Sequence, residues 1–347
     1  MTSEKERTFL DFLKLVSPGT SLRAVINDIL RSDLGAMIVF NSPTLQQQNI
    51  FEGGFRINSR FTAQKLFELC KMDGAIVLSQ DLKRILHANV LMNPDTNIRS
   101  IETGTRHKAA ERTAKQAHTF VITISERRKK TTLYHASSRY YLKSTEELIR
   151  NITSNLQILE KQREILTEHL INLNILEMSE LVSVSDVCKV IQRTEMILKI
   201  SDSIKRNFTE LGKEGSIMHM RYREILRGVE KSENGILRDY ANLPLKRAKT
   251  LLSNLTFEGL LETESIARLI LEKSLEESIS PKGYRFLSHL TLSAKETSQI
   301  IKLNKNIDNI IKLEPRSLEP ILKNRSSTIY KEIGNIREQI INGKIIC

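Results

Sequence analysis

Two short segments near the N-terminus contain residue types that could hold a metal ion and phosphate groups. In the first, Asp73 and Gly74 stand directly before the apolar run 75–78, which the sequence predicts to be a buried strand. A carboxylate at the end of a strand can bind Mg²⁺ or Mn²⁺, ions that prefer oxygen ligands and phosphate partners. Glycine lets a ligand approach the backbone closely. Because an Asp-Gly pair is also a common turn, this segment alone leaves both interpretations open.

The second segment, residues 102–108, reads Glu-Thr-Gly-Thr-Arg-His-Lys and runs into a predicted helix. Gly104 and Thr105 stand where this helix begins, and helix N-termini present free N–H groups to anions. The three basic residues 106–108 add positive charge at the same end, where charge of this sign opposes the helix dipole. That conflict indicates a bound anion, and the alternative is a solvated basic turn. The basic run 127–130 could reach the same phosphates or form a solvated hairpin turn.

Several short apolar runs and helical patterns alternate over residues 1–143 and would position both segments. We expect strands at 35–40, 75–78, 85–92, 120–124 and 131–134, and helices at 22–30, 63–69 and 108–117. Strands that alternate with helices predict an α/β domain with a central mixed sheet.

The sequence pattern changes after Lys143, from alternating strands and helices to helices alone. Ser144 followed by acidic residues is a good helix start, and apolar residues then recur with a 3/4 spacing from Ile152 to Leu173. No proline occurs between Pro94 and Pro244, which predicts an all-helical middle domain over 144–280. Its apolar seam is either a subunit contact or an intramolecular core. A small, basic helical domain is expected over 281–347.

The formal net charge of +12 is distributed unevenly, with +9 over 1–143, −3 over 144–280 and +6 over 281–347. Basic segments favour anionic partners such as nucleotides, nucleic acid or acidic lipid, although surface charge of this kind can also serve only solubility. The three cysteines are far apart and form no CxxC pair, so neither a zinc site nor a disulfide framework is indicated. Neither a membrane span nor a signal peptide is evident, and we expect a cytoplasmic protein without a membrane partner.

Three motifs together resemble the diadenylate cyclase family: Asp73-Gly74-Ala75, Gly104-Thr-Arg-His-Lys108 and Ala110-Glu-Arg112. The helical middle and the segment Ser280-Pro-Lys-Gly-Tyr-Arg285 are similar to the layout of the family's DNA integrity scanning branch. The resemblance implies a nucleotidyltransferase that condenses two ATP molecules into cyclic di-AMP and two pyrophosphates. It also implies a homo-oligomer, an octamer, in which cyclase domains face each other.

The resemblance also implies site residues and a Mg²⁺ or Mn²⁺ cofactor. Asp73 would be the catalytic residue and the metal ligand, near the attacking ribose hydroxyl. The residues that would bind ATP are Gly74, Ala75, Met92, Gly104, Thr105, Arg106, His107, Lys108, Ala109, Ser125, Arg127 and Arg128. The family usually has Arg-His-Arg-Thr where this chain has residues 106–109. Lysine at 108 keeps the charge but loses the two-pronged grip on phosphate, which predicts lowered activity.

The C-terminal domain departs further from the family, whose last domain resembles a helix-hairpin-helix that binds DNA through a Gly-x-Gly turn. We expect the equivalent stretch at 318–322, with Pro320 and Leu322 at the glycine positions. Proline lacks the N–H that would bind a phosphate, so the hairpin is degenerate and DNA binding is weakened. Two other functions remain open: a DNA-binding or scaffold protein with a degenerate cyclase site, and a receptor for cyclic dinucleotides.

Overall fold

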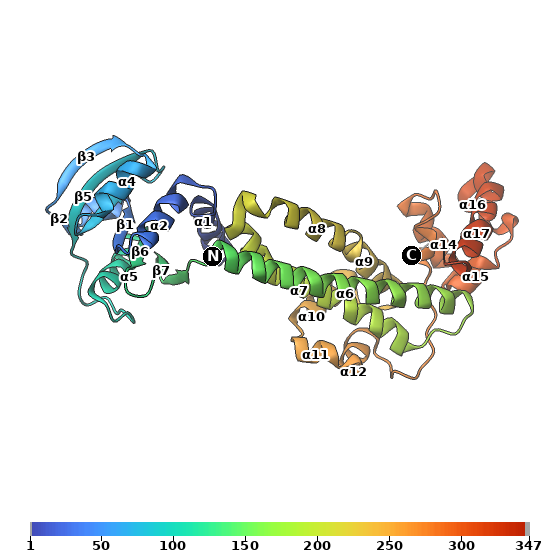
Figure 1. Cartoon of the computed structure of the whole chain (residues 1–347). Coiled ribbons are helices and arrows are strands. Elements are labelled where there is room, and N and C mark those ends of the chain that lie inside the picture. Colours follow the sequence, from blue (N-terminus) through green and yellow to red (C-terminus); the bar gives the residue numbers. More distant parts are fainter. Residues whose placement is uncertain (1, 344–347) are drawn as a thin grey trace. The chain divides into compact units, whose positions relative to one another are not determined.

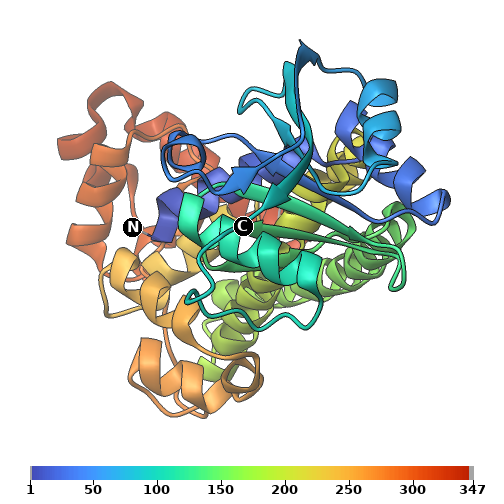
Figure 2. The same ribbon diagram turned by 90° about the vertical axis from the view of Figure 1, so that its left-hand side faces the viewer.

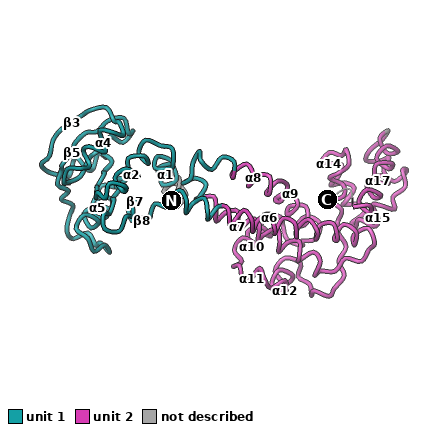
Figure 3. The backbone as a smooth tube through the Cα atoms, viewed as in Figure 1, with its two compact units in different colours: residues 1–152, 206–217 teal, residues 153–205, 218–347 magenta. Residues whose placement is uncertain are grey.

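The computed structural model describes residues 2–343 and divides into two compact units. Unit 1 comprises residues 1–152 and 206–217, and unit 2 comprises 153–205 and 218–347 (Figure 3). The candidate site lies in unit 1, whose strands and helices are seen from two directions in Figure 1 and Figure 2.

Unit 1 is built on an eight-stranded sheet with the order β2-β5-β4-β1-β6-β7-β8, in which β3 also pairs with β5. The strands are β1 Ala36–Phe40, β2 Phe51–Glu52, β3 Phe55–Arg60, β4 Ala75–Leu78, β5 Arg84–Met92, β6 Phe120–Ser125, β7 Lys130–His135 and β8 Ser138–Tyr141. Strands β1 and β4 are parallel, and the other pairings are antiparallel. The predicted mixed sheet is therefore confirmed.

Helices cover both faces of this sheet. On one face, α1 (Thr2–Leu15), α2 (Ser21–Arg31) and α4 (Ala63–Cys70) bury their apolar sides against residues such as Ile38 and Ile76. On the other face, α3 (Pro43–Gln47) and α5 (Thr105–Ala117) pack on the alternate residues of the same strands, including Val39 and Val77. Because β1 and β4 are buried on both faces, they are continuously apolar, as the sequence indicated.

The rest of the described chain is almost entirely helical, which confirms the predicted change from an α/β domain to a helical region. The helices are α6 Thr145–Met178, α7 Val184–Leu211, η1 Gly212–Gly215, α8 Ser216–Leu226, α9 Val229–Tyr240, α10 Leu245–Asn254, α11 Phe257–Leu261, α12 Thr263–Ile266 and η2 Ala267–Leu271. The seam from Ile152 to Leu173 is buried within the chain itself. Of the two alternatives for this seam, an intramolecular core is therefore the correct one. No helix in the described range 2–343 is both long enough and apolar enough to span a bilayer.

The last helices surround an apolar cluster of their own. They are α13 Tyr284–Leu287, α14 Ala294–Asn304, α15 Ile307–Ile311, α16 Pro315–Leu322, η3 Lys323–Arg325 and α17 Ser326–Ile341. Residues 318–322, predicted to be a hairpin turn, instead form the last part of α16, with Pro320 inside that helix. The chain reverses at η3, where Lys323 has a φ of 49°. The predicted position of the turn was wrong because Leu318 and Leu322 are buried in the cluster and continue the helical spacing.

Candidate active site

One edge of the sheet gathers the ends of several elements that carry predicted site residues. The parallel pair β1 and β4 places Met37 opposite Ala75, so both strands begin at this edge. Strand β6 runs the other way, with Ile124 opposite Ala36, and therefore ends there. The turn that contains Asp73, the chain before Ala36 and the turn after β6 thus lie at the same edge.

The N-terminus of α5 lies at this edge as well. A Cβ atom added to Gly35 would lie 2.1 Å from Nη1 of Arg106 and 3.4 Å from the carbonyl oxygen of Ile124. The guanidinium of Arg106 therefore rests against the bare Cα of Gly35, where β1 begins. Sequence reasoning did not identify Gly35 as part of the site, and only its position directly before an apolar strand could have indicated it.

Helix α5 begins without a side-chain cap. Its N-cap residue is Gly104, which has no side chain that could accept hydrogen bonds from the free N–H groups. The first turn of the helix contains no acidic residue. The Lys108 N–H donates to the Gly104 carbonyl at 2.8 Å and closes the first turn. The earlier N–H groups of this turn, with the exposed Lys108 side chain beside them, form an anion-binding helix end.

Asp73 is exposed in the turn before β4. Throughout residues 2–343 no group of three or more His, Cys, Asp or Glu side chains could hold a metal ion. A divalent ion at this edge would therefore be held by at most two such side chains together with oxygens of the bound ligand and water. Mg²⁺ is often bound in this way, through one or two carboxylates, substrate phosphates and water.

Position 74 requires glycine for two reasons, its backbone conformation and the lack of space for a side chain. Its φ is +89°, and an added Cβ would lie 2.9 Å from the carbonyl carbon of Asn89 and from the carbonyl oxygen of Val90. Asn89 itself has a φ of 53° at an irregularity in the pairing of β4 with β5. The glycine thus lets β5 pass close to the turn and fixes the position of Asp73 just before β4 begins.

The imidazole of His107 points toward the sheet and is held by a chain of hydrogen bonds. Its Nδ1 lies 2.9 Å from the Tyr134 hydroxyl and 3.0 Å from Oγ1 of Thr123. The Tyr134 hydroxyl donates to Oε1 of Glu102 at 2.9 Å, and Arg139 donates to the same oxygen at 2.9 Å. Glu102 is buried and paired with Arg139, so the network anchors the start of α5 to β6, β7 and β8.

This environment keeps His107 neutral near pH 7. Burial lowers the pKa of His107 most strongly, Glu102 opposes this, and the charges of Arg128 and Arg106 lower it further. Burial and the hydrogen bond to Glu102 raise the pKa of Tyr134. Arg106 on α5 and Arg128 in the β6–β7 turn therefore both lie near this imidazole.

Two residues of the third sequence motif hold the segment before α5. Buried Glu111 accepts hydrogen bonds from Oγ of Ser100 at 2.6 Å and from the Ile101 N–H at 3.1 Å. The Nε of Arg112 donates to the carbonyl of Ile98 at 2.9 Å. This motif therefore positions the loop that leads to Gly104.

The remaining predicted site residues divide into apolar and polar groups. The side chains of Ala75 and Met92 belong to the apolar core under α5, and Ala109 packs against it, so only backbone atoms or edges of these residues can meet a ligand. The Arg128 N–H donates to Oγ of Ser125 at 3.2 Å and closes the turn after β6. Arg127 is exposed in that turn, as is Arg128.

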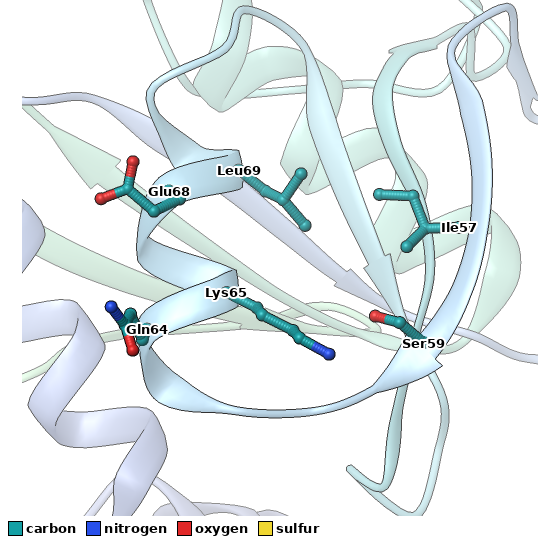
Figure 4. A pocket seen from close by; sticks show the side chains of 6 residues that line it. All are labelled: Ile57, Ser59, Gln64, Lys65, Glu68 and Leu69. Carbon is teal, nitrogen blue, oxygen red and sulfur yellow. The ribbon is translucent and has the colours of Figure 1, made fainter.

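A pocket of about 490 Å³ lies elsewhere in unit 1, between β3 and α4 (Figure 4). Ile57 and Leu69 form its apolar walls, and Lys65 and Glu68 belong to its rim. It contains no residue that the sequence predicted for the site. The edge of the sheet, rather than this pocket, combines the carboxylate with the basic helix end.

A mixed sheet whose edge carries a free-standing carboxylate and an uncapped, basic helix N-terminus is typical of nucleotide-binding α/β domains. A family model for the "DisA bacterial checkpoint controller nucleotide-binding" domain matches residues 23–139, and one for the "DisA bacterial checkpoint controller linker region" matches 142–276. The chain belongs to the DNA integrity scanning family of diadenylate cyclases.

Curated relatives support this assignment over nearly the whole chain. The DNA integrity scanning protein DisA of Acetivibrio thermocellus is 36% identical over 348 residues, which cover 97% of this chain and 96% of the relative. The protein of the same name from Clostridium kluyveri is 36% identical over 350 residues, which cover 98% and 99%. Among solved structures, DacA from Staphylococcus aureus is 22% identical with a TM-score of 0.32, covering 41% of this chain and 91% of that chain.

Proposed function

We propose that two copies of unit 1 face each other across the edge described above, each holding one ATP, and that they join the two nucleotides into cyclic di-AMP. In each half-reaction the 3′-hydroxyl oxygen of one ATP attacks the α-phosphorus of the other. A new P–O bond forms, the bond to the pyrophosphate breaks, and the hydroxyl proton is released. Repetition in the opposite sense closes the ring and releases the second pyrophosphate.

Asp73 is the residue that would hold a divalent metal ion. Such an ion, Mg²⁺ or Mn²⁺, would neutralise charge on the triphosphate when bound. Asp73 suits this role because it is exposed, and because no group of three or more metal-binding side chains among the described residues would saturate the ion before ATP arrives.

The start of α5 would bind the phosphates. The free N–H groups after Gly104 and the charges of Arg106 and Lys108 point to an anion at this helix end. Neutral His107 would act through position: its ring is fixed between α5 and the sheet, and it keeps the first turn of the helix in place. Positioning and charge stabilisation supply most of the rate in transfers of this kind.

The single observation that carries this proposal is the common edge of the sheet. The parallel pairing of β1 with β4 and the packing of Arg106 against Gly35 bring the two sequence motifs to the same end of the strands. Had the motifs come to opposite ends, the carboxylate and the phosphate-binding helix end could not have served one nucleotide.

The direct test is product formation by the full-length chain incubated with ATP and Mg²⁺ or Mn²⁺, with cyclic di-AMP measured by chromatography. Asp73→Asn should abolish the product without unfolding the protein. Asp28→Asn is the matched control, because Asp28 is an exposed acid on α2 with only a long ion pair of 3.9 Å to Arg31. Absence of product from folded, oligomeric wild-type protein would favour the alternative, a DNA-binding or scaffold protein with a degenerate site.

We further propose a homo-octamer, which the resemblance implies and the need for facing sites supports. The mass of the particle in solution tests it, and a monomer at the concentration of full activity would contradict it.

Binding of DNA by the last domain is proposed only as a weak, charge-driven contact, given the +6 over 281–347 and the proline inside α16. Affinity for branched DNA over a salt series, with and without residues 289–347, tests this contact.

A further inference from the structure

A cavity of about 980 Å³ lies within unit 2 and contains no residue of the cyclase edge. Its walls come from α6, from α9 and from the segment that runs through α13 to the start of α14. Its volume is at the upper end of the range of roughly 300–1,000 Å³ found for small-molecule sites. The cavity can therefore hold a ligand of the size of a nucleotide.

Four cationic side chains line this cavity. Arg163 comes from α6, Lys231 and Arg238 stand seven positions apart on one face of α9, and Arg285 comes from α13. Glu230 is the one acid among the described residues that line it. Its carboxylate is paired with Lys249 at 3.1 Å, so it does not neutralise the cavity.

Three of these cations have no acidic partner. Arg163, Lys231 and Arg238 form no ion pair with any side chain in the described part of the chain. One Nη of Arg163 donates to the carbonyl of Arg227 at 3.2 Å, while its other Nη is buried with no hydrogen-bond partner. A buried guanidinium nitrogen that lacks an acceptor is costly, and an anion in the cavity would satisfy it.

The side chain of the fourth cation, Arg285, is buried and held in one position by hydrogen bonds. Its side chain is 3% exposed, and its guanidinium donates to Glu177 at 2.7 Å and to Asn174 at 2.5 Å. The stem of Arg285 lies against Gly235 of α9, where an added Cβ would come within 2.8 Å of its Cγ. The Arg285 side chain is thus ordered before a ligand binds, which lowers the entropic cost of binding.

The segment that contains Arg285 also contributes two rings to the lining, those of Tyr284 and His289. Burial lowers the pKa of His289 first, and the charges of Lys231 and Arg285 lower it further. This imidazole therefore lies beside positive charges on the lining of the cavity. A flat ring beside a cluster of cations suits a ligand that combines a base with phosphates.

We propose that this cavity binds a free nucleotide carrying two or more phosphates, which places a second nucleotide site on the chain besides the cyclase edge. Lys231, Arg238 and Arg163 bind the phosphates, and the rings of Tyr284 and His289 lie beside the base. The concave shape favours a small ligand over duplex DNA, because the cations line the walls of a cavity instead of a flat or convex face.

The test uses the full-length chain and radiolabelled ADP in equilibrium dialysis, which counts the sites per chain and gives each dissociation constant. Wild-type protein is expected to bind ADP in the cavity. The double variant Lys231→Gln/Arg238→Gln should weaken that site by about a hundredfold, since each charge-assisted contact contributes roughly tenfold or more. Arg106→Ala should leave the cavity site unchanged and affect the cyclase edge alone, so failure of one site is distinguishable from failure of the other.

Lys246→Gln/Arg247→Gln is the matched control, because it removes the same charge from two exposed residues of α10 in the same unit. Thermal unfolding of each variant shows whether it is folded. The proposal is overturned if ADP does not bind outside the cyclase edge, or if the cavity variant and the control variant bind ADP equally well. Displacement of ADP by a short duplex that binds more tightly would overturn it too, since the cavity would then be a DNA contact.

Discussion

Replacing Gly35 by alanine should slow the formation of cyclic di-AMP without destabilising the protein. Gly35 does not have a positive φ, so alanine fits its backbone and restricts the unfolded chain, which on its own stabilises by about 0.4–1 kcal/mol. The new methyl group would occupy the place where Nη1 of Arg106 now rests, 2.1 Å away. The end of a flexible side chain can move aside, so the fold tolerates the change but the guanidinium does not keep its position.

The size of the effect follows from the displacement. Ordinary van der Waals contact begins at 3.4 Å, so Nη1 must retreat by about 1.3 Å, the difference between 3.4 and 2.1 Å. A misplacement of about 1 Å can cost on the order of a hundredfold in rate. We therefore expect kcat/KM to fall by roughly 10- to 100-fold, which corresponds to about 1.4–2.7 kcal/mol of transition-state stabilisation.

Initial rates of cyclic di-AMP formation at several ATP concentrations, together with thermal unfolding, measure both quantities. Gly334→Ala serves as the control, because a Cβ there meets nothing within 4 Å and the rate should not change. Arg106→Ala should reproduce the loss of rate seen in Gly35→Ala, and combining the two changes should add little. A wild-type rate in Gly35→Ala would refute the reasoning that the position of the Arg106 guanidinium matters.

Three further predictions concern stability. Gly74→Ala should lower the free energy of unfolding by about 1–3 kcal/mol in a denaturant titration, because φ is +89° and β5 lies too close for a Cβ; an unchanged midpoint would contradict this. Burial and Glu233 raise the pKa of Glu195 from 4.5 to about 7, so the cost of its charge is absent in acid, grows as pH rises from 4.5 to 7, and is complete above 7. Glu195→Gln should therefore stabilise at pH 8 by on the order of 1 kcal/mol and little at pH 5, and an equal effect at both would count against it. The pKa of His107 is lowered, so the unfolded state takes up the proton first as pH falls below about 6.5 and stability is lost there; His107→Gln should flatten that part of the stability curve, whereas a parallel curve would contradict the assignment.

The sequence predicted the elements with strong apolar patterns and missed those without one. Strands β1, β4 and β6 were evident because their residues are buried on both faces. Strand β3 was missed, since its residues are mostly exposed and it lies outside the main order of the sheet as a second partner of β5. Helix α1 was missed because its first residues are polar and charged.

For the candidate site, spacing and residue type indicated the Asp73 turn and the basic start of α5, but not what holds them together. The contact of Arg106 with Gly35 depends on which strands pair, and that pairing joins segments far apart in the chain. The partners of His107 come from β6 and β7, and no local pattern connects them to α5. Tertiary pairing, which local periodicity does not encode, supplies this part of the site.

Electron paramagnetic resonance of Mn²⁺ in the presence of a non-hydrolysable ATP analogue tests the central claim most directly. If Asp73 holds a divalent ion against the triphosphate, the wild-type chain will show a bound Mn²⁺ with coupling to phosphorus nuclei. In Asp73→Asn that signal will be lost, while the basic helix end still binds the nucleotide. An identical Mn²⁺ signal in Asp73→Asn would contradict the account.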